Sequence, residues 1–311
     1  MVETVKLTAI MLARNEEWIL GCSLRVALRW CDEVVILDHG STDATPDIIT
    51  DMARAHPGRV HTIRVRATDG WHEQTHRQMA YATAVAHGGT HFAIIDADEV
   101  PTGNLLAGGG LALRDLISDG KLSDGQMVAL REFCLWESLD AWRTDGAFAP
   151  ERCRQIVLGF PHAPNLHWQP REDGYHLHAR YPMGHHGIWN PCPSWIGGGI
   201  MHLQFADMRR HRAKNWWYRM VERIQHPGKR TPQETNEMYG WCFEGTPETR
   251  PAEYTTPEGA RSFWDGIPER RYITLGAKPW HEDEIERLLA KHGTEPFRGL
   301  YLGPYTERIA A

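Results

Sequence analysis

Short apolar runs alternate with amphipathic segments along the first hundred residues of the chain. Leu7–Ala13 (LTAIMLA) is apolar at almost every position, which is typical of a strand buried on both faces of a parallel sheet. Further strands are predicted over 33–38, 60–65 and 91–95, with helices between them. Strands that alternate with helices form parallel βαβ units. The pattern therefore predicts an α/β fold whose central sheet is mostly parallel and flanked by helices.

The predicted helices carry recognisable start and stop signals. The segment 14–17 places acidic residues in a first turn, and apolar residues at helical spacing follow it. Thr45 and Pro46 combine a capping hydroxyl with a proline at the first helical position, so we expect a helix to begin there. A third helix, over 73–87, is closed by two glycines.

Polar residues gather at three of the predicted strand ends: 14–17, 38–43 and 96–99. In parallel α/β sheets, ligands bind in the crevice beyond the carboxyl ends of the strands, so the three groups should line one crevice. Neither the glycine fingerprint of dinucleotide-binding folds nor a Walker phosphate loop follows the first strand. A dehydrogenase and a P-loop enzyme are therefore disfavoured.

Asp96 and Asp98 are two residues apart in an extended segment, so both side chains point to the same side. A lone pair of this kind is more often merely a solvated turn. Here the pair directly follows a buried strand, lies beside two other polar strand ends and is joined by Glu99. Such crowded carboxylates repel one another unless a cation is present. The pattern favours Mg²⁺ or Mn²⁺ holding a diphosphate.

Three segments, taken in order, resemble family 2 glycosyltransferases with the GT-A fold: 7–17 (LTAIMLARNEE), 38–45 (DHGSTDAT) and 95–99 (IDADE). They cover about the first third of the chain. The resemblance implies a metal-dependent enzyme that transfers a sugar from a nucleotide-sugar to an acceptor. A UDP-sugar is the expected donor, because Asp38 could accept a hydrogen bond from the imide N–H of uracil.

The resemblance also implies which residues form the site. Asp98, the last aspartate of the D-x-D motif, is expected to bind the metal, and Asp96 to approach the ribose or the metal. His202 follows a glycine run and is expected as a further metal ligand. Arg77 is expected to face the donor phosphates, and a plain surface arginine is an equally good interpretation. The expected donor-binding residues are Ala13, Arg14, Glu16, Asp38, Ser41, Arg77, Asp96 and Lys214.

Beyond residue 100 the resemblance is diffuse. Strands are predicted over 127–136 and 154–168, and a basic amphipathic helix over 207–225. The basic face of this helix has three interpretations: it is solvated, it brings Lys214 or Arg210 to the donor pyrophosphate, or it rests on anionic lipid. Peripheral membrane contact therefore stays open.

An inverting transfer needs a carboxylate base near the acceptor nucleophile. Glu172 and Asp173 are favoured because they lie in a polar loop with flanking aromatic residues, and Glu137 and Asp140 are the other candidates. A retaining mechanism, without such a base, stays open.

Trp189 and Trp195 are candidate stacking surfaces for the acceptor, although packing in the core explains them equally well. The acceptor itself is left open between a saccharide, a peptide and a small molecule. The Q-x-x-R-W motif of processive polysaccharide synthases is absent from the sequence, so a single, non-processive transfer is expected.

We expect residues 1–230 to form a GT-A catalytic domain, with 1–100 as its nucleotide-binding half and 101–230 as its acceptor half. Residues 231–311 are expected to form a C-terminal extension packed on that domain. Its first part, to about residue 280, is rich in Pro, Thr and Glu and is predicted to be irregular. A short helix is predicted over 282–292.

Composition narrows the class of protein further. A formal net charge of −6 and a pI near 6.3 argue against a general nucleic-acid binder. No stretch approaches the roughly 18 apolar residues of a membrane span, and no secretory signal is recognised. The 6 cysteines are scattered, which predicts a cytoplasmic protein without a disulfide framework.

Two rival functions remain. A sugar-1-phosphate nucleotidyltransferase shares an α/β nucleotide fold, but it would show a glycine-rich basic loop after the first strand. A catalytically inactive carbohydrate-binding protein is the other rival, and the presence of Asp38, Asp96 and Asp98 counts against it.

Overall fold

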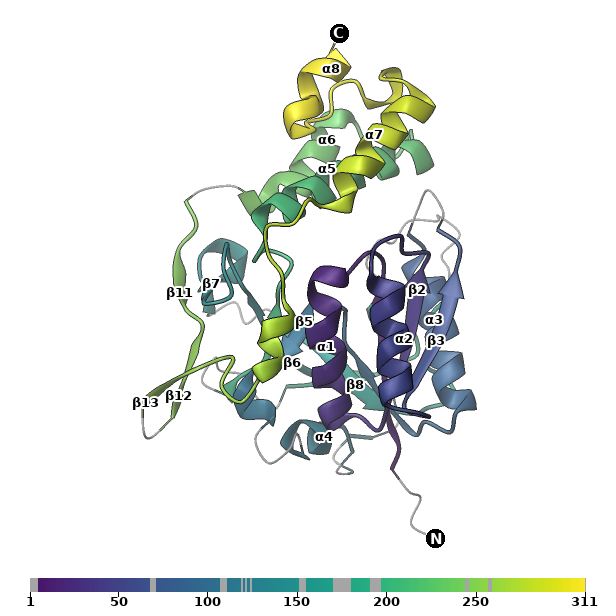
Figure 1. The fold of residues 1–311 in the computed structure, drawn as a ribbon, viewed down its shortest axis with the longest axis vertical. Coiled ribbons are helices and arrows are strands. Elements are labelled where there is room, and N and C mark those ends of the chain that lie inside the picture. Colours follow the sequence, from purple (N-terminus) through teal and green to yellow (C-terminus); the bar gives the residue numbers. More distant parts are fainter. Residues whose placement is uncertain are drawn as a thin grey trace.

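The computed structural model describes residues 5–67, 71–106, 111–118, 120, 122–123, 125–150, 155–169, 180–190, 197–243, 246–256 and 259–310. Figure 1 shows an α/β body with a group of C-terminal helices at one end. The strands of the main sheet are β1 (Leu7–Ala13), β2 (Glu33–His39), β3 (Val60–Val65), β4 (His91–Ile94), β5 (Glu99–Pro101), β6 (Gln126–Cys134), β8 (Gln155–Pro161), β9 (Gly187–Trp189) and β10 (Ile200–His202). The helices are α1 (Glu17–Trp30), α2 (Thr45–Ala55), α3 (Glu73–Ala86), α4 (Leu111–Ser118), α5 (Met208–Gln225), α6 (Pro232–Gly240), α7 (Trp280–His292) and α8 (Thr306–Ala310).

The main sheet has the strand order β3-β2-β1-β4-β8-β6-β10-β5, and β9 pairs with β6. β1 is parallel to both of its neighbours, with Ala13 opposite Asp38 on β2 and Leu7 opposite His91 on β4. β8 is antiparallel to β4 and β6, whereas β10 is parallel to β6. The predicted α/β fold with a mostly parallel sheet is confirmed.

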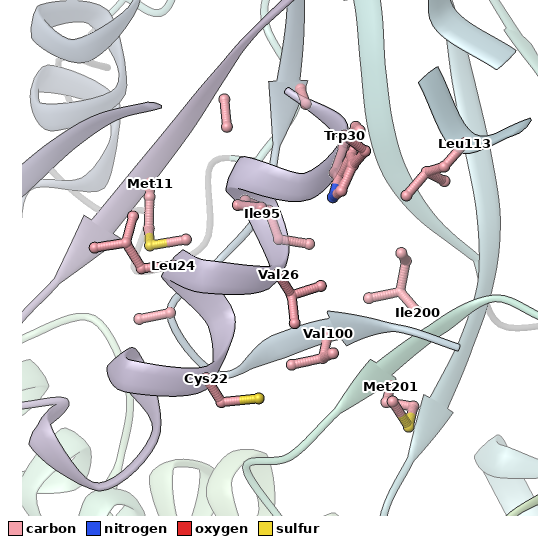
Figure 2. Packing of buried hydrophobic residues seen from close by; sticks show 14 of the residues in the cluster. Met11, Cys22, Leu24, Val26, Trp30, Ile95, Val100, Leu113, Ile200 and Met201 are labelled. Atoms are coloured by element: carbon pink, nitrogen blue, oxygen red, sulfur yellow. The ribbon is translucent and has the colours of Figure 1, made fainter. Parts of the chain in front are cut away.

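Side chains alternate along β1, and each set belongs to a different core. Met11 packs on the α1 side of the sheet, in a cluster with Leu24 and Ile95 (Figure 2). Ile10 points to the opposite face and belongs to a cluster that includes Ala84 of α3. Because both faces are covered, β1 has to be apolar along its length, and all of its residues are buried.

The strands and helices predicted for the first hundred residues are confirmed, with one difference in detail at α2. We expected Thr45 to cap this helix, but the helix begins at Thr45, and it is Oδ1 of Asp43 that accepts from the backbone N–H of Thr45, at 2.9 Å. The hydroxyl of Thr45 instead accepts a hydrogen bond from the backbone N–H of Glu16 at 2.8 Å. It thereby ties the start of α2 to the loop that follows β1.

The C-terminal helices share a small core of their own. Trp217 and Met220 of α5 pack in it with Ile285 and Leu288 of α7. Although α5 was expected to belong to the acceptor half, it is packed on the C-terminal extension. Among the described helices, including the 18-residue α5, none is long and apolar enough to cross a membrane.

The extension is more regular than we expected. Helix α6 begins with a capping box, in which Thr231 and Glu234 bond each other's backbone N–H groups, and with a proline in its first turn. The prediction of an irregular segment was wrong for α6. It relied on the composition of the segment and overlooked these local signals for a helix start. The short strands β7 (Ala141–Arg143), β11 (Thr249–Pro251), β12 (Glu253–Thr256) and β13 (Gly259–Ser262) and the helix α4 were not predicted either.

We predict that Leu288→Ala lowers the free energy of unfolding by about 2–5 kcal/mol, because it leaves a cavity in the core that α5 and α7 share. Leu288 is fully buried in that core. Urea unfolding followed by tryptophan fluorescence measures the change. Leu275→Ala, at a leucine that is 37% exposed, is the control and should change stability little. Equal stability of the two variants would show that the C-terminal core contributes nothing to folding.

Candidate active site

A pocket lies beyond the carboxyl ends of β1 and β4, between the start of α3, the end of β10, and the helices α5 and α7. This is the edge of the sheet at which we expected the polar clusters to meet. Its lining residues are Leu12, Arg14, Glu16, Trp71, Glu73, Arg77, Asp96, Ala97, Asp98, His202, Gln204, Lys214, Trp217, Tyr218, Trp280 and His281. Those named from the sequence are Arg14, Glu16, Arg77, Asp96, Asp98, His202 and Lys214.

The loops after β1 and β2 are bound to each other beside this pocket. Asn15 adopts a left-handed backbone conformation, with φ of 54°. Its side-chain oxygen accepts from the backbone N–H of Thr42 at 2.7 Å, and its own N–H donates to the hydroxyl of Ser41 at 2.8 Å. These bonds hold the loop that presents Arg14 and Glu16 in one conformation.

Ala13, Asp38 and Ser41, predicted as donor contacts, are buried beside the pocket but do not line it. Oδ1 of Asp38 accepts from the backbone N–H of Ser41 at 2.9 Å, and its Oδ2 lies 3.3 Å from Nε of Arg64. Asp38 is only 1% exposed. In this structure it holds the turn after β2, and a contact with a base would require the carboxylate to be released.

The carboxylate of Asp96 is held by two arginines. Nη2 of Arg77 donates to its Oδ1, and Nη1 of Arg180 donates to its Oδ2 at 3.1 Å. Burial raises the pKa of Asp96, but the two guanidinium groups outweigh it and bring the pKa below its ordinary value. We expected a metal or a ribose next to Asp96. Both of its oxygens are instead occupied by cations that the protein supplies.

The same arginines bind two further carboxylates. Arg77, predicted to face the donor phosphates, is 1% exposed and also pairs with Glu73 at 3.1 Å. Arg180 also pairs with Glu99, at 2.8 Å, and donates to the carbonyl of Ile94 at 2.6 Å. Burial raises the pKa of Glu99 to about 7, although Arg180 opposes this. The arginines therefore neutralise most of the acidic cluster.

Asp98 is bound to a histidine. Its Oδ2 lies 3.5 Å from Nε2 of His202, at the end of β10. The other ring nitrogen of His202, Nδ1, lies 2.5 Å from Oε1 of Glu132 on β6. Glu132 is 7% exposed and was not predicted. A bond from the N–H of Leu203 to the carbonyl of Asp98, at 2.9 Å, fixes the spacing of the two segments.

Asp98, His202 and Glu132 stabilise one another's charged forms. Burial lowers the pKa of His202, but Asp98 and Glu132 reverse the effect and raise it to about 10. Burial likewise raises the pKa of Asp98, and His202 brings it well below the ordinary value. Glu132, Cys134 and His202 also present ligand atoms close enough to one another to share a metal ion.

Glu16 and Lys214 extend into the same pocket. Burial and the nearby Asp98 raise the pKa of Glu16 to about 7, and its Oε2 accepts from the indole N–H of Trp18 at 2.6 Å. Burial lowers the pKa of Lys214, but Tyr218 and Asp98 raise it above its ordinary value. Lys214 is thus a cation held next to the Asp98 carboxylate.

Aromatic residues form much of the remaining wall, and sequence reasoning did not identify them. Trp71 lies near the start of α3 and contacts His39 and His76 edge-on, each at 5.3 Å between ring centroids. The opposite part comes from α5 and α7: Trp217, Tyr218, Trp280 and His281. In the sequence, helical spacing assigns Trp217 only to an apolar stripe. That this stripe reaches the site depends on how α5 packs against α7, which the sequence does not reveal.

Trp189, predicted to stack on the acceptor, lies far from the pocket. It pairs with Val128 near the start of β6, whereas His202 pairs with Cys134 at the other end of that strand. Six residues of strand separate them, which is about 20 Å. Trp195, Glu172 and Asp173 lie outside the described residues.

We predict that acid destabilises the protein partly through His76. Burial and the neighbouring His72 and Arg77 lower the pKa of His76 to about 4. A depressed histidine pKa contributes stability that is present above about pH 6.5 and is lost as the pH falls towards 4. Replacement of His76 by Gln should therefore reduce the loss of unfolding free energy between pH 7 and 4.5 by roughly 2 kcal/mol.

Urea unfolding at several pH values measures this difference. The exposed His185, replaced by Gln, is the control and should leave the pH dependence as in the wild type. An unchanged slope in the His76 variant would contradict the prediction.

Comparison with known proteins agrees with the resemblance. Residues 8–108 match the family described as Glycosyl transferase family 2. No curated protein sequence matches the chain. Among solved structures, TarS 1–349 of S. aureus is 20% identical with a TM-score of 0.31, over 42% of this chain and 36% of that one.

Glucosyl-3-phosphoglycerate synthase of Mycobacterium tuberculosis, in complex with Mn²⁺, UDP and glucosyl-3-phosphoglycerate, is 23% identical with a TM-score of 0.27. The match covers 42% of this chain and 44% of that one, so the chain spans less than half of these structures. Residues 8–108, about a third of the chain, are thus similar to glycosyl transferase family 2, in agreement with the resemblance of the three motifs.

Proposed function

We propose that this protein transfers a sugar from a nucleotide-sugar, most simply a UDP-sugar, to an acceptor, with a divalent cation held by Asp98 and His202. The observation that carries the proposal is the Asp98–His202–Glu132 chain, which lies in a pocket beyond the carboxyl ends of the strands. Lys214 and Arg14 line the same pocket and supply positive charge for a diphosphate.

The two proposed ligands fit a cation. Oδ2 of Asp98 and Nε2 of His202 are 3.5 Å apart. This separation is one that two ligands of a single divalent ion can have, since each ligand atom lies about 2.0–2.6 Å from such an ion. One oxygen and one nitrogen ligand suit Mn²⁺ well and Mg²⁺ less well. Asp96 is paired with Arg77 and Arg180, so we propose that it lies beside the cation and helps to orient it without binding it directly.

Glu132 would orient His202 for this task. A histidine that binds a metal commonly donates its other ring N–H to a carboxylate, which fixes the tautomer and the direction of the ring. Nδ1 of His202 is 2.5 Å from Oε1 of Glu132 and so leaves Nε2 for the ion. Glu132 is therefore proposed as a positioning residue.

In the proposed reaction, an acceptor hydroxyl, amine or thiol bonds to the anomeric carbon as the bond from that carbon to the diphosphate oxygen breaks. The nucleoside diphosphate leaves with the bonding electrons; Asp98 and His202 would hold the cation, which would supply positive charge for this leaving group. Lys214 would pair with the same leaving group. The acceptor proton passes to a base, for which Glu172 and Asp173 stay the predicted candidates of an inverting transfer.

The remaining parts of the proposal rest on the sequence. We keep residues 1–230 as the catalytic domain and 231–311 as an extension that takes part in the site through Trp280 and His281. A single transfer per encounter, a saccharide, peptide or small-molecule acceptor, and a cytoplasmic location complete it.

We predict that UDP raises the melting temperature weakly alone and clearly with Mn²⁺, because a ligand that binds only the folded state stabilises it. Asp98→Ala should abolish the increment that Mn²⁺ adds, whereas Asp51→Ala, at an exposed carboxylate of α2, should preserve it. Thermal unfolding with UDP, with Mn²⁺ and with both measures these increments. Equal metal increments in the wild type and Asp98→Ala would remove the metal assignment.

A second prediction concerns Glu132. Glu132→Gln keeps the shape of the side chain but removes the charge that orients His202, so the affinity for Mn²⁺ should fall by about 10–100-fold. Isothermal titration with Mn²⁺ in the presence of UDP measures the affinity. Glu222→Gln, at another buried glutamate, is the matched control and should bind Mn²⁺ like the wild type. A Glu132 variant with wild-type Mn²⁺ affinity would contradict the positioning role.

A further inference from the structure

The wall of the pocket that α5 and α7 contribute has no assigned role. We define this aromatic wall by four residues, Trp217, Tyr218, Trp280 and His281. Trp280 and His281 open α7, which follows the segment matched by the family by more than 150 residues. The wall is therefore a feature of this chain's C-terminal helices rather than of the nucleotide-binding unit.

The rings of the wall are packed as a unit. Trp280 stacks on His281 at 4.0 Å between centroids, with an interplanar angle of 24°. Trp217 meets Trp280 at 5.2 Å and His281 at 5.7 Å, in both cases edge to face. The helices that carry these rings are held together by the core around Leu288. A ligand in the pocket therefore meets a preformed, mostly apolar surface.

Two polar atoms of this wall are buried without a partner. Nδ1 of His281 and Nε1 of Trp280 have no hydrogen-bond partner among the described residues. His281 is 3% exposed, and burial keeps its pKa well below the ordinary value, so the ring is neutral. A buried polar atom without a hydrogen-bond partner destabilises the folded state, so atoms of this kind call for a partner. A ligand with hydroxyl groups can supply both a donor and an acceptor.

The wall has positive charge on the side where it meets the proposed diphosphate site. Lys214 and Arg14 both lie against the rings: Nζ of Lys214 is 5.8 Å from the Tyr218 ring centroid, and the guanidinium carbon of Arg14 is 4.8 Å from that of Trp280 and 5.5 Å from that of Trp217. Glu284 of α7 balances Arg14 at 3.7 Å. The wall thus combines apolar ring faces with neutral hydrogen-bonding groups, which is the chemistry that a pyranose ring requires.

We propose that the aromatic wall binds a sugar ring, with a ring face against Trp280 and hydroxyl groups bonded to His281 and the Trp280 N–H. This inference rests on the proposed function, since the sugar is one of its substrates. The bound sugar ring belongs either to the donor or to a saccharide acceptor. Lys214 lies one helical turn before Trp217 and Tyr218, so a sugar linked to the diphosphate reaches the wall from that side.

The experiment compares wild type, Trp280→Ala and Trp280→Leu in two arms. In the first arm, titration calorimetry with Mn²⁺ present compares the affinity for UDP with that for UDP-glucose, UDP-galactose and UDP-N-acetylglucosamine. In the second arm, UDP release from the same donors is measured with and without methyl glucosides, maltose and cellobiose. Trp241→Ala, at an exposed tryptophan that is not part of the wall, is the matched control.

If the donor sugar occupies the wall, UDP affinity should stay within about twofold in both Trp280 variants while the preferred UDP-sugar loses about tenfold. If an acceptor occupies it, donor affinity should hold and the KM of the stimulating saccharide should rise about tenfold. Trp280→Leu keeps apolar bulk in the core, so it remains informative if the alanine variant does not fold.

Normal UDP binding with no sugar-dependent effect of Trp280→Leu in either arm would overturn the inference. A loss of UDP affinity equal to the loss for the UDP-sugars would overturn it as well, because the wall would then serve the nucleotide. Absence of UDP binding in the folded wild type would instead contradict the proposed function.

Discussion

The site depends on one chain of interactions, in which Asp98 contacts His202 and His202 contacts Glu132. Its members come from the end of β4, from β10 and from β6, which are far apart in the sequence. The register of these strands, together with the bond from Leu203 to the carbonyl of Asp98, brings them together. Because the ring of His202 is held on both sides, the direction of Nε2 is set before any ligand arrives. Preorganisation of this kind is what a cation site requires.

The repulsion between the carboxylates after β4 is relieved in a different way from the one we expected. From the sequence, we expected these crowded carboxylates to need a bound cation. Arg77 and Arg180 supply most of that charge from within the protein, by pairing with Asp96 and Glu99. Asp98 alone remains directed at His202 and Lys214. Within the D-x-D motif, Asp96 is thus paired with two arginines, whereas Asp98 is paired with His202.

The fold of the first hundred residues could be predicted because its signals are local: continuous apolar runs for strands covered on both faces, and polar turns at their ends. The positions of Asp98 and His202 followed from topology and from the family resemblance. Arg180, Glu132 and His281 could not be found in this way. Each acts through a partner that is distant in the chain, and a single arginine, glutamate or histidine has no local pattern to mark it.

The division between the strand ends and the C-terminal helices also bears on which sugar the protein selects. Among the residues that strand ends bring together, Asp98 would suit the proposed cation and Arg14 the diphosphate that all nucleotide-diphosphate sugars share. The ring surfaces come instead from α5 and α7, which pack on each other through their own core and meet the first strand at Arg14. Figure 1 shows these helices at one end of the α/β body, and the pocket lies where they meet it. Because hydrogen bonds and stacking discriminate between sugars far more than charge does, selectivity for the sugar should reside in the helices rather than in the sheet.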